Sequence, residues 1–198
     1  MGTVEANQVF TDLRELSPRE FVSEYLFDRV PHLFSGDRKL YVEWKTKLAN
    51  AIEVDPACII LVGSSAVGIS LNPAKHFKRF DETSDIDVAV VSNYHFTVAW
   101  RFLRTQGHRR THVDAKTRIA WDEHVRRFIY WGTIATDKLL GILPFGPQWL
   151  SAVTEMTRVT PTVGRDIKLR IYSDYESLRT YQVLSAQNAR EDILVQGD

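Results

Sequence analysis

The fold is decided by residues 59–92, which read IILVGSSAVGISLNPAKHFKRFDETSDIDVAVVS. The apolar runs at 58–62 and 86–91 have the length, the β-branched content and the turn-rich flanks of buried strands. Between them lie a Gly63-Ser64 pair and two alternating carboxylates, Asp85 and Asp87. Two carboxylates at the mouth of a buried strand are costly unless positive charge lies between them. The stretch therefore predicts two core strands that carry a charged site.

The residue types of this site suit phosphate and metal binding. A strand followed by Gly63, Ser64, Ser65 and a helix start lets a phosphate approach the backbone and small hydroxyls. Asp85 and Asp87 are two residues apart on a strand, so they point to the same face and can hold a divalent ion. Mg²⁺ prefers such hard oxygen ligands, completed by phosphate and water. The alternative is a turn aspartate, an exposed strand carboxylate and a tight Gly-Ser-Ser turn without a ligand.

The rest of the chain predicts a small sheet with helices before, between and after its strands, an α/β or α+β class. A third strand is expected at 166–173, where apolar and charged residues alternate. Ser17, Pro18 and Glu20 form a helix-start signal with a capping box. Helices are expected at 17–30, 38–54, 95–106, 117–143 (mostly helical, with a break at Gly132), 147–158 and 174–192.

Composition limits the class of protein. The chain has 198 residues, 44% of them hydrophobic, with 25 basic and 25 acidic residues and zero formal net charge. A chain of this length and composition suits one folded domain. Because its net charge is zero, no overall electrostatic attraction to nucleic acid or membrane is expected. A single cysteine excludes an internal disulfide and a multi-cysteine metal site. With no signal-peptide pattern and no apolar run of about 20 residues, we expect a cytoplasmic protein without a membrane partner.

The motifs VGSSAVGISL and SDIDVAVV resemble the core of the nucleotidyltransferase superfamily related to DNA polymerase β. The chain is most similar to an uncharacterised bacterial group of nucleotidyltransferase-like proteins. The matching residues there include Tyr130-Trp131-Gly132 and Arg170-Ile171-Tyr172, and the similarity covers most of residues 17–190. The resemblance implies the small mixed sheet of the polymerase β-like core with flanking N- and C-terminal helices. It implies one domain over 1–198, with a helical extension at 17–54 and a core at 58–190.

The resemblance also implies roles for residues. Gly63 and Ser64, with Ser65 beside them, would hold a nucleoside triphosphate, and Asp85 and Asp87 would hold Mg²⁺ or Mn²⁺. A third carboxylate on a later strand activates the attacking hydroxyl in that superfamily. Asp166 at the start of the 166–173 strand is the candidate, while Asp174 beyond its end is a candidate helix cap. The loop at 72–83 is long, and its Lys75, Lys78 and Arg79 either reach the triphosphate or acceptor or are solvated.

Two functions follow as expectations. The first is a Mg²⁺-dependent nucleotidyltransferase that moves a nucleoside monophosphate from an NTP to a hydroxyl of a protein, RNA or small-molecule acceptor, with Asp85, Asp87 and Asp166 catalytic and Lys78 among the phosphate-binding residues. The alternative is a catalytically degenerate relative that senses a nucleotide or binds a partner in a bacterial defence or toxin–antitoxin system. The basic stretch at 101–118 either binds an acceptor's phosphates or is a solvated helix end. The acceptor, the preferred base and the oligomeric state are not specified by these motifs.

Overall fold

The chain is organised around a four-stranded mixed sheet, so the expected α/β (α+β) class is confirmed. The computed structural model describes residues 6–196, the side chains of Ala6, Arg109, Lys138 and Gln196 excepted. The strands lie in the order β1-β2-β4-β3. Their bounds are Ile59–Val62 for β1, Ile86–Val91 for β2, Thr133–Ala135 for β3 and Ile167–Tyr172 for β4.

Strand pairing brings distant segments of the chain together. β1 is antiparallel to β2, with Val62 opposite Asp87, and β3 is antiparallel to β4. β2 and β4 are parallel, with Asp87 opposite Lys168. Residues directly opposite each other in a sheet point to the same face. The charged residues of β2 and β4 therefore share one face.

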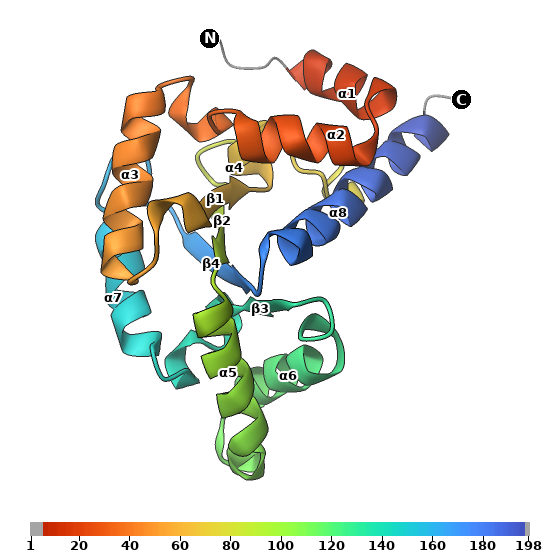
Figure 1. Cartoon of the computed structure of the whole chain (residues 1–198). Helices are drawn as coiled ribbons and strands as arrows, with labels where there is room; N and C mark the ends of the chain where they lie inside the picture. Colours follow the sequence, from red (N-terminus) through yellow and green to blue (C-terminus); the bar gives the residue numbers. More distant parts are fainter. Residues whose placement is uncertain (1–5, 197–198) are drawn as a thin grey trace.

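Helices cover both faces of this sheet. In Figure 1, α3 and α7 lie on one side of the strands and α8 lies on the other, with α2 running beside α8. The helices are α1 (Ala6–Glu15), α2 (Pro18–Val22), α3 (Arg38–Ala51), α4 (Ser64–Val67), α5 (Asn93–Thr105), α6 (Ala115–Glu123), α7 (Gly146–Met156) and α8 (Tyr175–Gln196). Two π-helical segments, Ser23–Asp28 and His124–Phe128, continue α2 and α6.

The core forms where the apolar face of the sheet meets these helices. Ile86, Val88 and Val90 of β2 are fully buried, as the strand alternation predicts. Trp44 of α3 is also buried, and its indole N–H donates to Thr162 Oγ1 at 3.0 Å. Thr162 Oγ1 in turn donates to the Met156 main-chain oxygen at 2.8 Å. The Trp44 indole is thus hydrogen-bonded inside the core, and the charged side chains of β2 and β4 lie on the other face of the sheet.

The helix ends expected from the sequence are confirmed at both caps. Ser17 Oγ accepts from the Glu20 N–H, and the Glu20 carboxylate accepts from the Ser17 N–H, which completes the capping box. Asp174 Oδ1 accepts from the Ser177 N–H at 2.7 Å at the start of α8. α1 was not predicted, because the first helix signal in the sequence was at Ser17.

The helical prediction for 117–143 is wrong over 133–135. Helix α6 and its π-helical continuation end at Phe128, and Gly132 has a φ of 63° that turns the chain. Residues 133–135 form β3, an edge strand held by pairing to β4 and by the Thr133 hydroxyl, which donates to the Ile171 main-chain oxygen at 2.9 Å. Pairing with a distant strand outweighs the local helical pattern here.

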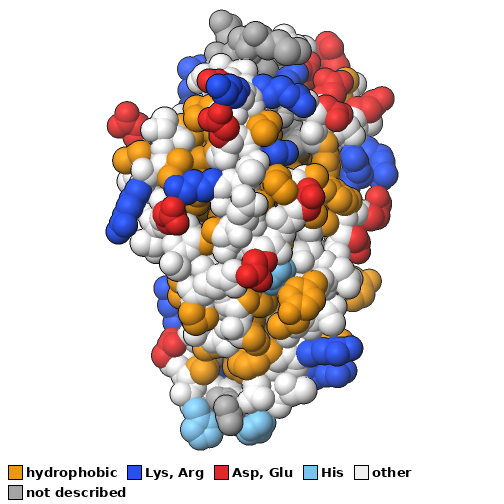
Figure 2. All heavy atoms as spheres, turned by 60° about the vertical axis from the view of Figure 1, so that its left-hand side comes forward, with side chains coloured by type: hydrophobic (Ala, Val, Ile, Leu, Met, Phe, Trp, Pro, Cys, Tyr) orange, Lys and Arg blue, Asp and Glu red, His pale blue; other side chains and the backbone are white. Residues whose placement is uncertain are grey.

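The surface carries charges of both signs. Figure 2 turns the α3 and α7 side of the molecule forward. Basic and acidic side chains are interspersed over the upper part of this face, and hydrophobic side chains gather in its lower part. This face therefore shows no large single-sign charged area, in keeping with zero net charge. No helix within residues 6–196 has the length and apolarity needed to cross a bilayer.

Candidate functional site

The Gly-Ser loop meets the Asp87 carboxylate of β2 where β1 ends. Val62, the last residue of β1, pairs with Asp87, so Gly63 lies beside the Asp87 side chain. Gly63 has φ 64° and ψ −153°, a conformation that side-chain-bearing residues almost never adopt. A Cβ at this position would lie 2.9 Å from Asp87 Oδ2. Both the backbone conformation and the approach of Asp87 therefore require glycine.

A pocket of about 560 Å³ opens over the charged face of the sheet beside this loop. Its walls come from the β1–α4 loop, the 70–75 loop, β2, β4, the turn after β3 and one side of α8. The charged residues that line it are Lys75, Asp87, Arg127, Asp137, Lys168 and Arg170. Four cations against two carboxylates make this pocket suitable for an anion.

Polar groups of α8 and the Gly-Ser loop complete the lining. Ser64, Gln182, Ser185 and Asn188 line the pocket together with Tyr172 and Tyr181. The Tyr172 hydroxyl accepts from Gln182 Nε2 at 3.3 Å, and burial raises the pKa of the Tyr172 hydroxyl. Tyr172 therefore stays neutral and can act only through hydrogen bonding.

Arg170 is oriented by aromatic rings. Its guanidinium lies 5.1 Å from the centre of the Tyr181 ring and 5.2 Å from that of Phe128, and it donates to the Tyr181 hydroxyl at 3.3 Å. These contacts hold the group in the pocket wall without neutralising its charge, because no carboxylate is paired with it among the described residues. Arg170 is therefore a fixed positive charge on the pocket side of β4.

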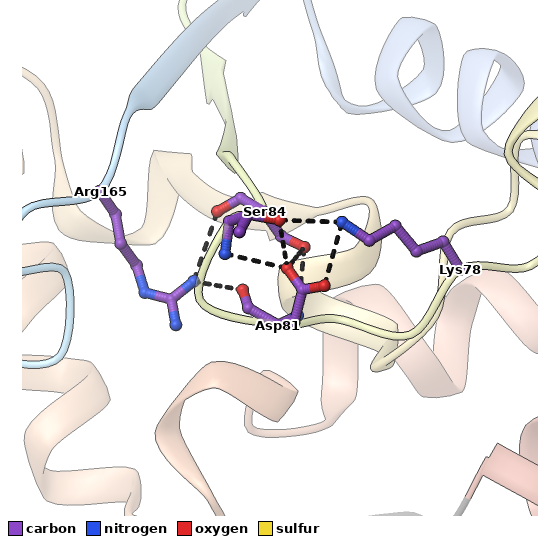
Figure 3. Close-up of polar contacts among 5 residues, drawn as sticks. Lys78, Asp81, Ser84 and Arg165 are labelled. Carbon is purple, nitrogen blue, oxygen red and sulfur yellow. Dashed lines mark hydrogen bonds and ion pairs between the residues drawn. The ribbon is translucent and has the colours of Figure 1, made fainter.

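A network of hydrogen bonds fixes the loop that precedes Asp85 (Figure 3). Asp81 Oδ1 accepts from the Thr83 N–H at 2.9 Å and from the Ser84 hydroxyl at 3.0 Å. The Thr83 hydroxyl and the Lys78 ammonium hold the pKa of Asp81 far below its usual range. Arg165 donates to the main-chain oxygens of Asp81 and Ser84, at 2.7 and 3.3 Å. These bonds fix the path of the loop and therefore the position of Asp85 directly before β2.

Lys78 belongs to this loop and does not line the pocket. Its ammonium lies 3.0 Å from Asp81 Oδ2 and 2.9 Å from Thr83 Oγ1. Lys75, three residues earlier, is the lysine of the 72–83 loop that lines the pocket. The structure therefore brings Lys75, rather than Lys78, to the pocket.

Asp85 is joined to β4 by an ion pair. Its Oδ2 accepts a hydrogen bond from the Lys168 ammonium. Both side chains are partly exposed, 34% for Asp85 and 42% for Lys168. The hydrogen bond that the Lys168 ammonium donates to Asp85, together with the negative charges of Asp85, Asp87 and Asp137, raises the pKa of Lys168. Lys168 is therefore a full cation at neutral pH.

Asp87 is in a different state from Asp85. Burial raises the pKa of Asp87, while the positive charges of Lys168, Lys75 and Arg170 oppose this shift. No hydrogen-bond donor of the described residues contacts its carboxylate, although the residue lines the pocket. A carboxylate that is half-buried, unpaired and surrounded by cations at some distance is prepared for a further positive or hydrogen-bonding group.

The remaining predicted residues are divided between the pocket and its surroundings. Ser64 lines the pocket, whereas Ser65 is fully buried and donates to the Val62 main-chain oxygen at 3.0 Å, a structural contact. Helix α4 is only four residues long, so little helix dipole supports the loop. Asp166 accepts from the Ile86 N–H at 2.8 Å through its main-chain oxygen, and its side chain is exposed outside the pocket lining.

Asp137 is the carboxylate that the sequence reasoning missed. It lies in the 3₁₀ turn Thr136–Lys138 directly after β3 and lines the pocket from the far side of Lys168. The signal that could have found it is the short β-branched segment after Gly132, with an acid at its end. Because that segment was interpreted as helical, its acid was not considered as part of the site.

Asp87 is the strand carboxylate that is available as a ligand for a divalent ion. No group of three or more His, Cys, Asp and Glu side chains suited to a metal lies within residues 6–196. Asp87 has a carboxylate without a hydrogen-bond donor, so it can ligate an ion whose other ligands are phosphate oxygens and water. Asp85 Oδ2 is already bonded to the Lys168 ammonium, which lowers the negative charge that this carboxylate offers to an ion.

Comparison with protein-family models, with curated proteins and with solved structures finds no match to this chain. The geometry of the pocket therefore carries the functional argument.

Proposed function

We propose that this pocket binds a nucleoside triphosphate with Mg²⁺ or Mn²⁺ and transfers its nucleoside monophosphate to a hydroxyl of a protein, RNA or small-molecule acceptor. The observation that supports this most is the approach of the Gly63 backbone to the Asp87 carboxylate, at the edge of a cationic pocket. A phosphate chain needs a close backbone approach and positive charge, and a divalent ion needs a carboxylate beside that phosphate. Here all three lie together.

Each residue would have a distinct part in this reaction. Gly63 and Ser64 would lie along the phosphates, and Lys75 would neutralise their charge from the 70–75 loop. Asp87 would hold the divalent ion, which when bound supplies charge neutralisation on the transferring phosphoryl group. Arg170 and Arg127 would hold the acceptor or the leaving phosphates on the β3 side of the pocket. Positioning and charge neutralisation account for most of the catalysis expected of such a site.

Asp137 would take the role of the third carboxylate. It lines the pocket and its charge acts on Lys168, whereas Asp166 is exposed outside the lining. A general base must come within hydrogen-bond reach of the hydroxyl from which it takes the proton. Because Asp137 lines the pocket, it is the carboxylate that we propose accepts the proton of a hydroxyl bound there.

The test is a transfer assay with each of the four α-labelled NTPs, Mg²⁺ or Mn²⁺, bulk RNA and cell lysate. Label should enter an acceptor with the wild type and with Glu43→Gln, an exposed control on α3. It should be lost with Asp87→Asn and reduced about 10²-fold or more with Asp137→Asn. Retained transfer with Asp87→Asn would refute the assignment. If transfer were lost with Asp166→Asn but not with Asp137→Asn, the general base would be Asp166 and not Asp137.

A second function is favoured by one observation, the Lys168–Asp85 ion pair. If the charge of Asp85 is already compensated by Lys168, the site would bind a nucleotide without catalysing its transfer. The protein would then be a nucleotide-sensing or partner-binding module, for example in a bacterial defence or toxin–antitoxin system. Nucleotide binding that is lost with Asp87→Asn, without transfer to any acceptor, would support this function over the enzyme.

A further inference from the structure

Lys168 stands where three carboxylates converge. It is directly opposite Asp87 in the β2–β4 register, its ammonium bonds Asp85, and the charge of Asp137 acts on it from the β3 side. The two neighbours of Lys168 on β4, Ile167 and Leu169, are buried on the other face. The strand therefore projects one basic side chain on which the charges of all three carboxylates act.

This arrangement differs from an ordinary surface ion pair. Pairs between exposed side chains contribute little and need no defined partner. Lys168 rises from a strand that is flanked on both sides by other strands, and its ammonium lines a pocket. If position 168 served only to fill space in the pocket wall, an apolar side chain would be sufficient. A hydrogen-bonded ammonium among carboxylates instead does what a hard cation does, because it compensates their charge.

The ammonium also has hydrogen-bonding capacity left. It carries three N–H donors, and among the described residues it donates to one acceptor, Asp85. The remaining donors can serve a phosphate oxygen in the pocket. Lys75, Arg127 and Arg170 add positive charge along the same walls. The pocket is therefore able to attract an anion before any metal ion arrives.

We propose that Lys168 is the resident cation of this site: it occupies Asp85, contacts the nucleotide phosphates itself, and leaves room for one divalent ion, at Asp87. The identity of the anion as a nucleoside triphosphate rests on the function proposed above. Two consequences follow. The protein binds nucleotide without a metal ion, and removal of the Lys168 charge lets Asp85 join Asp87 in a tighter metal site than that of the wild type.

The first test uses Mn²⁺ alone, with free Mn²⁺ followed by electron paramagnetic resonance. Lys168→Met should bind Mn²⁺ about tenfold more tightly than the wild type, because Asp85 and Asp87 become a joint site. Lys168→Arg, which keeps the charge, and Lys39→Met, which removes an exposed lysine of α3 outside the pocket, should match the wild type. Adding Asp85→Asn to Lys168→Met should abolish the gain. Equal Mn²⁺ affinity in the wild type and Lys168→Met, both folded by circular dichroism, would overturn the proposal.

The second test measures binding of a non-hydrolysable ATP analogue by calorimetry, in EDTA and in Mn²⁺. The wild type should bind in EDTA, and Lys168→Met should lose about tenfold in EDTA and recover in Mn²⁺. Wild-type binding that requires Mn²⁺ would overturn the resident-cation role. Absence of binding under both conditions, with this and the other three nucleotides, would refute the proposed function instead. The Mn²⁺ experiment would then decide the role of Lys168 without a nucleotide.

Discussion

Replacement of Gly63 by alanine should damage both the fold and the pocket. The conformation at φ 64° and ψ −153° costs a residue with a Cβ about 1–3 kcal/mol. The new Cβ would lie 2.9 Å from Asp87 Oδ2, so the Asp87 side chain must leave its rotamer, which adds of order 1 kcal/mol. We therefore expect a loss of about 2–4 kcal/mol in the free energy of unfolding, which lowers the Tm by roughly 4–16 °C for a domain of this size.

Gly164 provides a matched control for this experiment. It also has a positive φ, 71°, but a Cβ there would meet no heavy atom within 4 Å. Gly164→Ala should therefore lose only the backbone contribution, and nucleotide binding should be unchanged. Both variants would be compared by chemical unfolding and by calorimetric titration with the ATP analogue.

The contact with Asp87 can be isolated by a double-mutant cycle. In the Asp87→Ala background, Gly63→Ala should cost about 1 kcal/mol less than in the wild type, because the obstructing carboxylate is gone. The reasoning would be refuted if Gly63→Ala and Gly164→Ala destabilised equally while Gly63→Ala bound nucleotide like the wild type. That result would mean that the approach of Gly63 to Asp87 has no role in the site.

Three further outcomes are expected. Burial lowers the pKa of His95, so on acidification the unfolded chain binds a proton at this residue before the folded protein does. The stability that His95 contributes is therefore present above about pH 6.5 and is lost as the pH falls below that value. The free energy of unfolding, measured with urea across this range, should depend less on pH in His95→Gln. Thr162→Val removes the acceptor of the buried Trp44 indole and should cost about 1–3 kcal/mol in a thermal melt, and an unchanged Tm would contradict that role. Arg165→Met frees the main-chain oxygen of Asp81 and should weaken binding of the ATP analogue by about three- to tenfold with little change in Tm; unchanged affinity would show that the loop holds its place without Arg165.

Most secondary structure followed from local pattern, because its causes are local. The β-branched runs became β1 and β2, the alternation at 166–173 became β4, and Ser17 and Asp174 cap the helices as predicted. Strand β3 could not be predicted from local pattern, because it is only three residues long and lies within a segment whose apolar spacing is typical of a helix. What makes them a strand is the pairing with β4, which is a tertiary effect.

The site was predictable only in part, for a related reason. The sequence places Asp85 and Asp87 on one face of β2, and the alternation of β4 places Lys168 and Arg170 on one face of that strand. It does not indicate that these two faces are the same. That depends on a parallel pairing that joins Lys168 to Asp85, 83 residues away. Asp85 and Asp87 could be predicted from their spacing in the sequence. The position of Lys168 beside them could be recognised only from the register of the sheet.

The position of α8 has a consequence for how the pocket is made during synthesis. Gln182, Ser185 and Asn188 form its last wall, and every other lining residue precedes them in the chain. The same helix packs on α1 and α2, where Arg190 donates to the Leu16 main-chain oxygen at 3.2 Å. During synthesis the pocket therefore lacks this wall until α8 has been made and has docked. The nucleotide binding proposed above would in this way depend on the docking of α8.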